Sequence, residues 1–270
     1  MHDSNRPSSP AAARKGYLLR CALSAALAAV GAAAGTHAYA AAACDAPWMH
    51  QGGGYTSTLA PGQRSMTYTV TQFSKRDGNN CNGQVHAVMK MSMGGQPMQS
   101  ESDFGFEIAD GKAIAAAEKN TGTLHSASGM ASFGAALSSQ TTGVLSYVGE
   151  ITSEGQRIAG THTEGAMSGT PANGGQAVGG MNVPKFVTVT SDKVVGKQEQ
   201  LPTAVGTIVC WPVTYDRSTQ ADNAQLMGHM ANLSMKSHVV DHFCPSTGLV
   251  MRQDTTVNGR TITLTVSAVH

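Results

Sequence analysis

Segments in which apolar and polar residues alternate recur along this sequence, and they constrain its fold more than any other feature. Residues 64–73 read RSMTYTVTQF, which places Met66 and Tyr68 on one face and threonines on the other. A period of two is the pattern of a β-strand with one buried face. Dipeptides that favour tight turns, such as Asn258-Gly259, separate several of these segments. The pattern therefore predicts a series of antiparallel hairpins.

Nine further segments have strand character, at residues 84–93, 104–109, 145–151, 156–167, 185–194, 206–215, 234–243, 248–257 and 260–269. We expect an all-β protein built on an antiparallel curved sheet, an open barrel or a sandwich-like arrangement. Residues 121–143 and 168–182 are of low complexity and are expected to contribute Gly/Ser-rich loops, the first with one short helix or none and the second as a hairpin tip or lid. A short helix that begins near Asp222 is predicted within residues 221–235.

Residues 1–40 have the pattern of a secretory signal peptide. Three basic residues precede an apolar run, and Ala38 and Ala40 place small residues at the two positions that a signal peptidase reads. The run holds roughly 15 residues, whereas a membrane-spanning helix needs about 20. We expect cleavage after Ala40, a periplasmic or secreted product and no transmembrane segment after signal removal. Residues 41–62 are predicted as an irregular lead-in, and residues 63–270 as a single antiparallel β domain.

Four cysteines remain after residue 40: Cys44, Cys81, Cys210 and Cys244. An even number in an oxidising compartment predicts two disulfide bonds. Three pairings are open, and the two local ones, Cys44 with Cys81 and Cys210 with Cys244, are favoured. Lipid attachment is the alternative use of Cys44, although Ala41 stands where a lipoprotein signal usually has Leu.

Charge and motifs argue against several functional classes. Residues 41–270 contain 14 Lys and Arg against 16 Asp and Glu, so no nucleic-acid partner is expected. The sequence has neither a GxSxG nor an HExxH motif, and its carboxylates are scattered at predicted turns and strand ends. We therefore predict a non-enzymatic protein without a cofactor.

Methionine is the strongest anomaly in the composition. Met89, Met91 and Met93 are two residues apart, so a strand would project all three from one face. The chain has only 14 Phe, Trp and Tyr residues, and the flexible methionine side chain can fill apolar space where rings are scarce. Together with Met66 and Tyr68, these methionines are predicted to form the core or to line a groove for an apolar ligand, such as a lipid or an acyl chain.

Two alternatives remain open. Thioether sulfur is a soft ligand that suits copper, so Met89, Met91 and Met93, with His229 and Met230, are candidate ligands of a metal ion. One strand, however, supplies a row of sulfurs and not a convergent set. The other alternative is a structural or interaction module of the cell envelope, with an envelope protein as its partner.

The last third of the sequence resembles the TapB-like family of uncharacterised exported bacterial β proteins. Three segments carry the resemblance: LPTAVGTIVC at residues 201–210, HFCPSTGLVMRQ at residues 242–253 and TITLTVSAV at residues 261–269. The resemblance implies a curved antiparallel sheet of the kind that lipoprotein carriers use, whose concave face can accept an apolar ligand. It implies no catalytic residues.

Overall fold

The computed structural model describes residues 42–61, 64–93, 96–113, 120–126, 132–142, 147–173, 176–177, 181–226 and 229–270, which belong to one compact unit. The signal peptide predicted at residues 1–40 lies outside them. One short 3-10 helix, η1 (Ala43–Asp45), precedes the strands. The strands are β1 (Gly54–Ala60), β2 (Arg64–Asp77), β3 (Asn80–Met93), β4 (Gln96–Ala109), β5 (Lys112–Ala113), β6 (Asn120–Ser126), β7 (Ser132–Thr142), β8 (Arg157–Ile158), β9 (His162–Asn173), β10 (Gln176–Ala177), β11 (Met181–Thr190), β12 (Lys193–Val195), β13 (Glu199–Thr203), β14 (Gly206–Leu226), β15 (His229–Cys244), β16 (Leu249–Val257) and β17 (Arg260–Val269).

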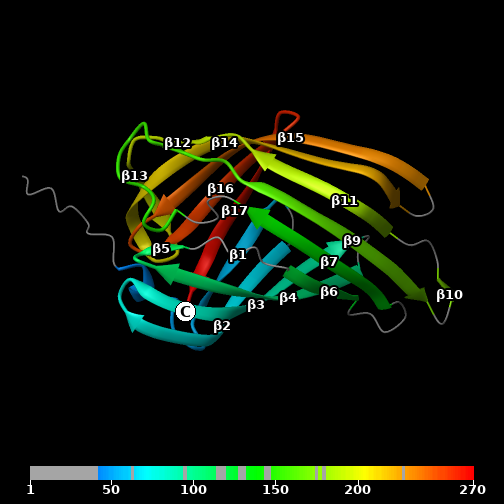
Figure 1. Cartoon of the computed structure of the whole chain (residues 1–270), viewed down its shortest axis with the longest axis horizontal. Helices are drawn as coiled ribbons and strands as arrows, with labels where there is room; N and C mark the ends of the chain where they lie inside the picture. Colours follow the sequence, from blue (N-terminus) through cyan, green and yellow to red (C-terminus); the bar gives the residue numbers. More distant parts are fainter. Residues whose placement is uncertain are drawn as a thin grey trace, which may run out of the picture. The chain divides into compact units, whose positions relative to one another are not determined.

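All strand pairs are antiparallel, and the sheet is curved (Figure 1). From β1 the main neighbours follow the order β2, β3, β4, β6, β7, β9, β11, β14, β15, β16 and β17. The last of these, β17, pairs with β1, so the first strand lies between β2 and the final hairpin. The prediction of an all-β protein with a curved antiparallel sheet is confirmed.

One face of this sheet is buried, and we call it the inner face. It carries Val70 of β2, Val213 of β14 and Val239 of β15, each at most 1% exposed. Side chains at the alternate positions of β14 and β15 point to the opposite face of the sheet. Asp216 and His238 are exposed on that face. This alternation follows from the pleat, which sends successive side chains to opposite faces.

Two tight turns have the conformation that their sequences predict. Asp110 and Gly111 have φ of 51° and 76°, and Asn258 and Gly259 have φ of 50° and 75°. Two consecutive positive φ values are typical of the type I′ turn, which Asn-Gly and Asp-Gly favour because both residues tolerate the left-handed region. The second of these turns joins β16 to β17 as expected.

The predicted irregular lead-in, residues 41–62, is only partly irregular, because β1 lies within it. The three glycines at residues 52–54, the last of which begins β1, allow the chain to approach β2 closely: the amide of Val70 donates to the carbonyl oxygen of Gly53, at 2.8 Å. A Cβ atom on Gly54 would lie 1.9 Å from the carbonyl oxygen of Tyr68. A glycine run that reads as a loop therefore serves to dock a strand.

Three local expectations were wrong. The helix predicted within residues 221–235 is absent from the described part of this segment, where β14 and β15 pair with each other instead. Residues 148–150, predicted as strand, form a turn. The low-complexity stretch 121–143, expected to be loop, contains β6 and β7. Helix propensity is weak, and long-range backbone pairing overrides it here.

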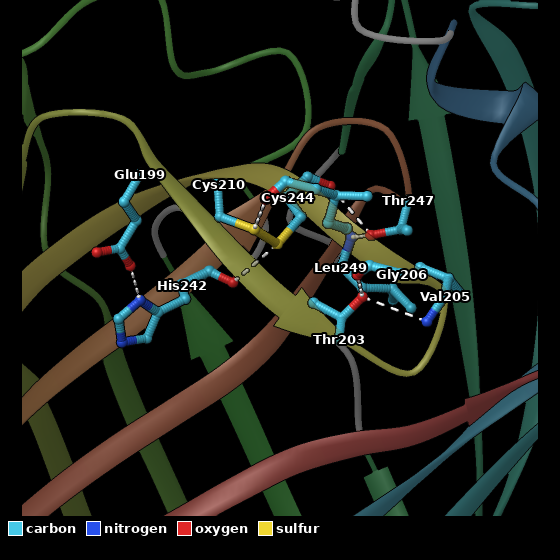
Figure 2. The surroundings of a disulfide bond; sticks show 10 residues. Glu199, Thr203, Val205, Gly206, Cys210, His242, Cys244, Thr247 and Leu249 are labelled. Carbon is cyan, nitrogen blue, oxygen red and sulfur yellow. Dashed lines mark hydrogen bonds and ion pairs between the residues drawn. A yellow bond between two sulfur atoms is a disulfide. The ribbon is translucent and has the colours of Figure 1, made fainter.

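Both disulfide bonds form with the favoured local pairing. Cys44 of η1 joins Cys81 of β3, with Cα atoms 6.0 Å apart. Since its sulfur is in this bond, Cys44 is not free for lipid attachment. Cys210 and Cys244 join β14 to β15, and Figure 2 shows their bond beside the ion pair of Glu199 and His242. No helix among the described residues has the length and apolar character needed to cross a membrane.

Candidate functional site

A cavity of about 610 Å³ lies against the inner face of the sheet. Small-molecule sites in proteins usually enclose about 300–1,000 Å³, so this volume suits a small organic ligand. Residues of β1, β2, β4, β5, β9, β11, β12, β14, β15, β16 and β17 line it, and these strands span most of the sequence. The lining has an aromatic part and a polar part.

The aromatic part consists of Trp48, Tyr55, Tyr68, Phe104 and Phe106. Tyr55 and Tyr68 are cross-strand partners on β1 and β2, and their rings stack with centroids 4.5 Å apart. Trp48 contacts Tyr55 edge-on at 5.4 Å, and Phe104 contacts Tyr68 edge-on at 6.2 Å. Each such pair stabilises the structure by roughly 0.5–1.5 kcal/mol beyond the burial of its area. The rings therefore form a rigid apolar wall.

Trp48 is held in place although no regular element contains it. Its indole Nε1 donates to the carbonyl oxygen of Thr247 at 3.0 Å. Four residues earlier, the disulfide between Cys44 and Cys81 fixes the chain to β3. The neighbouring Met49 is buried and also lines the cavity. Much of the segment predicted as an irregular lead-in thus supplies part of the cavity wall.

A buried carboxylate organises the polar part. Asp241 of β15 is 4% exposed, and its Oδ2 accepts a hydrogen bond from the hydroxyl of Tyr147 at 2.5 Å. Its Oδ1 accepts one from Nε2 of Gln253, the cross-strand partner on β16, at 2.7 Å. Burying a carboxylate is costly unless both oxygens find donors. Each carboxylate oxygen of Asp241 accepts a hydrogen bond from one donor.

The counter-charge of Asp241 is Lys193 of β12, which is 6% exposed. Its Nζ lies 5.0 Å from the ring centroid of Tyr147 and 5.3 Å from that of Tyr215, within the range of cation–π attraction. Burial lowers the pKa of Lys193, and the negative charge of Asp241 opposes that shift. Two ring faces and a carboxylate thus stabilise an ammonium group inside the protein.

Burial also raises the pKa values of Tyr55, Tyr68, Tyr147 and Tyr215 above the usual 10.0. The charge of Asp241 raises those of Tyr147 and Tyr215 further, because a tyrosinate beside a carboxylate is unfavourable. At neutral pH the four hydroxyls are therefore protonated. They donate hydrogen bonds, as Tyr147 does to Asp241 and Tyr68 does to Met66, and do not act as bases.

Hydroxyl groups surround a second cation of the cavity lining, Arg217 of β14. Its Nε donates to Oγ of Ser237, its partner on β15, at 3.4 Å. On the opposite side its register partner is Thr190 of β11. The hydroxyls of Thr188 and Thr219, the next such pair, lie 2.9 Å apart. The cavity lining thus changes from aromatic rings to hydroxyls and charged groups.

The structure brings some of the predicted ligand-lining residues together. Tyr68 lines the cavity, and its hydroxyl donates to Sδ of Met66 at 3.8 Å. Met66 is the cross-strand partner of Met89, so both share the face of Tyr68. The backbones of Met91 and Met93 continue β3, but their side chains lie outside the described residues. A ligand-lining role for these methionines stays a prediction.

The alternative metal ligands lie on strands that are not neighbours. His229 and Met230 are exposed on β15, Met230 by 64%, and β15 pairs with β14 and β16. Met89 is on β3, which pairs with β2 and β4. Among the described residues, no group of three or more His, Cys, Asp and Glu could hold a metal ion. Copper binding through thioethers stays a prediction.

Sequence reasoning missed the charged residues of the cavity, because it expected charges at turns and strand ends. One signal was present: Asp241 shares its strand face with Val239 and Phe243, which are both buried. A carboxylate at an apolar position of the alternation indicates a buried polar site. Tyr147, its hydrogen-bond partner, is 94 residues away in the sequence, and no local pattern connects the two.

No family model and no curated protein matches this sequence. Two similar solved structures are a protein inferred to be exported, with a YmcC-like fold, from Bacteroides fragilis, and an inferred lipoprotein from Parabacteroides distasonis. Both have a TM-score of 0.48, with 10% and 11% identity, and each alignment covers 82% of this chain and 96% of the other. The resemblance to the TapB-like family itself stays a prediction.

Proposed function

We propose that this is an exported, non-enzymatic envelope protein that binds an apolar or amphipathic small molecule, of lipid or acyl type, in the cavity on its inner face. The observation that carries the proposal is the cavity of about 610 Å³ with its two kinds of lining. Ligand sites are mostly apolar walls with a few placed polar groups. The signal-like residues 1–40 and the two disulfides support export.

The polar cluster favours binding over catalysis. Both oxygens of Asp241 already accept hydrogen bonds, from Tyr147 and Gln253. The raised pKa values of Tyr147 and Tyr215 make these hydroxyls poor bases at neutral pH. Such a cluster can orient the polar end of a ligand while the aromatic wall holds its apolar part. This division of roles needs no chemical step.

Enlarging a cavity-lining side chain tests the proposal. Leu264 of β17 lines the cavity, and replacing it with Trp would fill part of the space. We expect Leu264→Trp to weaken the binding of dodecan-1-ol by about tenfold or more, equivalent to about 1.4 kcal/mol. Isothermal titration calorimetry of the exported protein would measure the affinity.

A matched control is available on the same strand. Ile262 shares the face of Leu264 but is 37% exposed and does not line the cavity. Ile262→Trp should therefore leave the affinity for dodecan-1-ol within about twofold of the unmodified protein, a difference of roughly 0.4 kcal/mol. Equal weakening by both substitutions, or no binding to the unmodified protein, would contradict the proposed site.

The two alternative functions stay predictions. No contact within the described part of the chain favours a copper site formed by Met89, Met91 and Met93 with His229 and Met230. Likewise, no described feature identifies an envelope protein as partner. The cavity therefore remains the basis of the functional proposal.

A further inference from the structure

The charged groups of the cavity lining are not fully balanced. Lys193 has its counter-charge in Asp241, which opposes the downward shift of the lysine pKa. Arg217 also lines the cavity, but within the described part of the chain it forms no ion pair. Glu107 borders the cavity too, but this side chain is exposed and alternates along β4 with the inner-face residue Phe106. The polar part of the lining thus carries one excess positive charge.

Most donors of the Arg217 guanidinium have no protein partner among the described residues. A guanidinium offers five N–H groups, and among the described residues that of Arg217 forms one hydrogen bond, from Nε to Oγ of Ser237. Ser237 is 6% exposed, so the bond fixes one edge of the guanidinium against a buried strand. A planar, fixed guanidinium matches the two oxygens of a carboxylate.

Neutral hydroxyl donors lie next to this cation. Thr190 is the register partner of Arg217, and its hydroxyl lies 3.2 Å from that of Thr161. Thr163 and Thr188 are register partners on β9 and β11 and also line the cavity. Threonine hydroxyls can turn to donate to an anion without adding charge of their own. The surroundings of Arg217 can therefore solvate one anionic group.

We propose that the ligand of this cavity is an amphiphile with a carboxylate head, and that Arg217 selects the head while the aromatic wall holds the chain. This inference rests on the proposed binding of an apolar or amphipathic molecule. It adds the charge class of the ligand and the residue that recognises it. A single carboxylate would offset the one excess positive charge of the lining.

Two probes that differ only in the head group test this inference. Dodecanoate, below its critical micelle concentration, and dodecan-1-ol, below its solubility limit, are titrated with the exported protein by isothermal titration calorimetry. We expect dodecanoate to bind about tenfold more tightly than the alcohol, because a charge-assisted bidentate contact forms only with the carboxylate. Arg217→Gln should abolish this preference and change the affinity for the alcohol by less than about twofold.

Two further variants separate charge recognition from a structural role. Arg260→Gln removes an exposed arginine at the start of β17 and should leave both affinities unchanged. Arg217→Lys keeps the charge without the planar fork, so it should retain part of the preference even if the Gln variant fails to fold.

The outcomes distinguish the two proposals. If neither probe binds the unmodified protein, the proposed function fails, and the inference fails with it. If both probes bind equally, the binding function stands and a carboxylate-specific ligand is ruled out. If Arg217→Gln or Arg217→Lys weakens both probes by the same factor, Arg217 supports the structure and does not select the head group.

Discussion

The Asp241→Asn variant is expected to lose about 3–5 kcal/mol of unfolding free energy, as is typical when one partner of a buried ion pair is removed. Asp241 is 4% exposed and accepts hydrogen bonds from Tyr147 and Gln253. An asparagine side chain has a single acceptor oxygen, so Tyr147 or Gln253 would have to turn its donor away from residue 241 and the present hydrogen bonds could not both persist. The substitution also leaves the ammonium group of Lys193 buried without the negative charge of Asp241. Urea unfolding followed by circular dichroism would measure the loss.

The same substitution at an exposed carboxylate is the control. Asp216 Oδ1 lies 2.9 Å from Nδ1 of His238, within hydrogen-bond distance, but its side chain is 77% exposed. Asp216→Asn should cost no more than about 1 kcal/mol. Combining Asp241→Asn with Lys193→Met should recover part of the lost stability, because the unbalanced charge is removed as well. A cost below about 1 kcal/mol for Asp241→Asn would show that the cluster does not depend on this charge.

Removing either disulfide bond should also have a large effect. The bonds close loops of similar length, with sequence separations of 37 and 34 residues. The chain-entropy relation gives about 4 kcal/mol for loops of this length. Replacing Cys44 and Cys81, or Cys210 and Cys244, with alanine should therefore lower the unfolding free energy by about that amount in each case. Urea unfolding of the two double variants, compared with the oxidised protein, would measure both losses.

The losses of unfolding free energy in the two double variants can also be compared with each other. Since the loop lengths are nearly equal, the losses should agree within about 1 kcal/mol if the entropy of the unfolded chain dominates. A much larger loss for Cys210 and Cys244 would indicate that packing of this buried pair against Leu249 and Met251 contributes more than the entropy does. A loss below about 1 kcal/mol for both would contradict the account.

Local patterns predicted the strands well where one face is buried and the turn is specific. The hairpin of β16 and β17 is an example, because its alternation and the Asn258-Gly259 turn agree. They failed at residues 221–235, where small and apolar residues suggested a helix but β14 and β15 continue side by side. The side chains of this segment do not by themselves encode the strand, which also depends on backbone hydrogen bonds between β14 and the distant β11.

The candidate site was harder to predict than the fold. The alternation of Met66 with Tyr68 indicated the inner face, and Tyr68 does line the cavity. The polar cluster, however, depends on contacts between distant segments, such as the bond from Tyr147 to Asp241. Trp48 closes the aromatic wall from a segment that reads as loop, and its partner Thr247 lies 199 residues away. The alternation of apolar and polar residues indicates which side chains share a strand face. It does not indicate which strands pair or which distant residues come into contact.

The most direct test of the central claim is to identify small molecules that co-purify with the protein. Protein isolated from its native envelope would be analysed by native mass spectrometry and by mass spectrometry of its organic extract. The account predicts a lipid or acyl compound at close to one per chain, and much less of it on Leu264→Trp purified in the same way. Equal amounts on both proteins, or none on either, would contradict binding in the cavity.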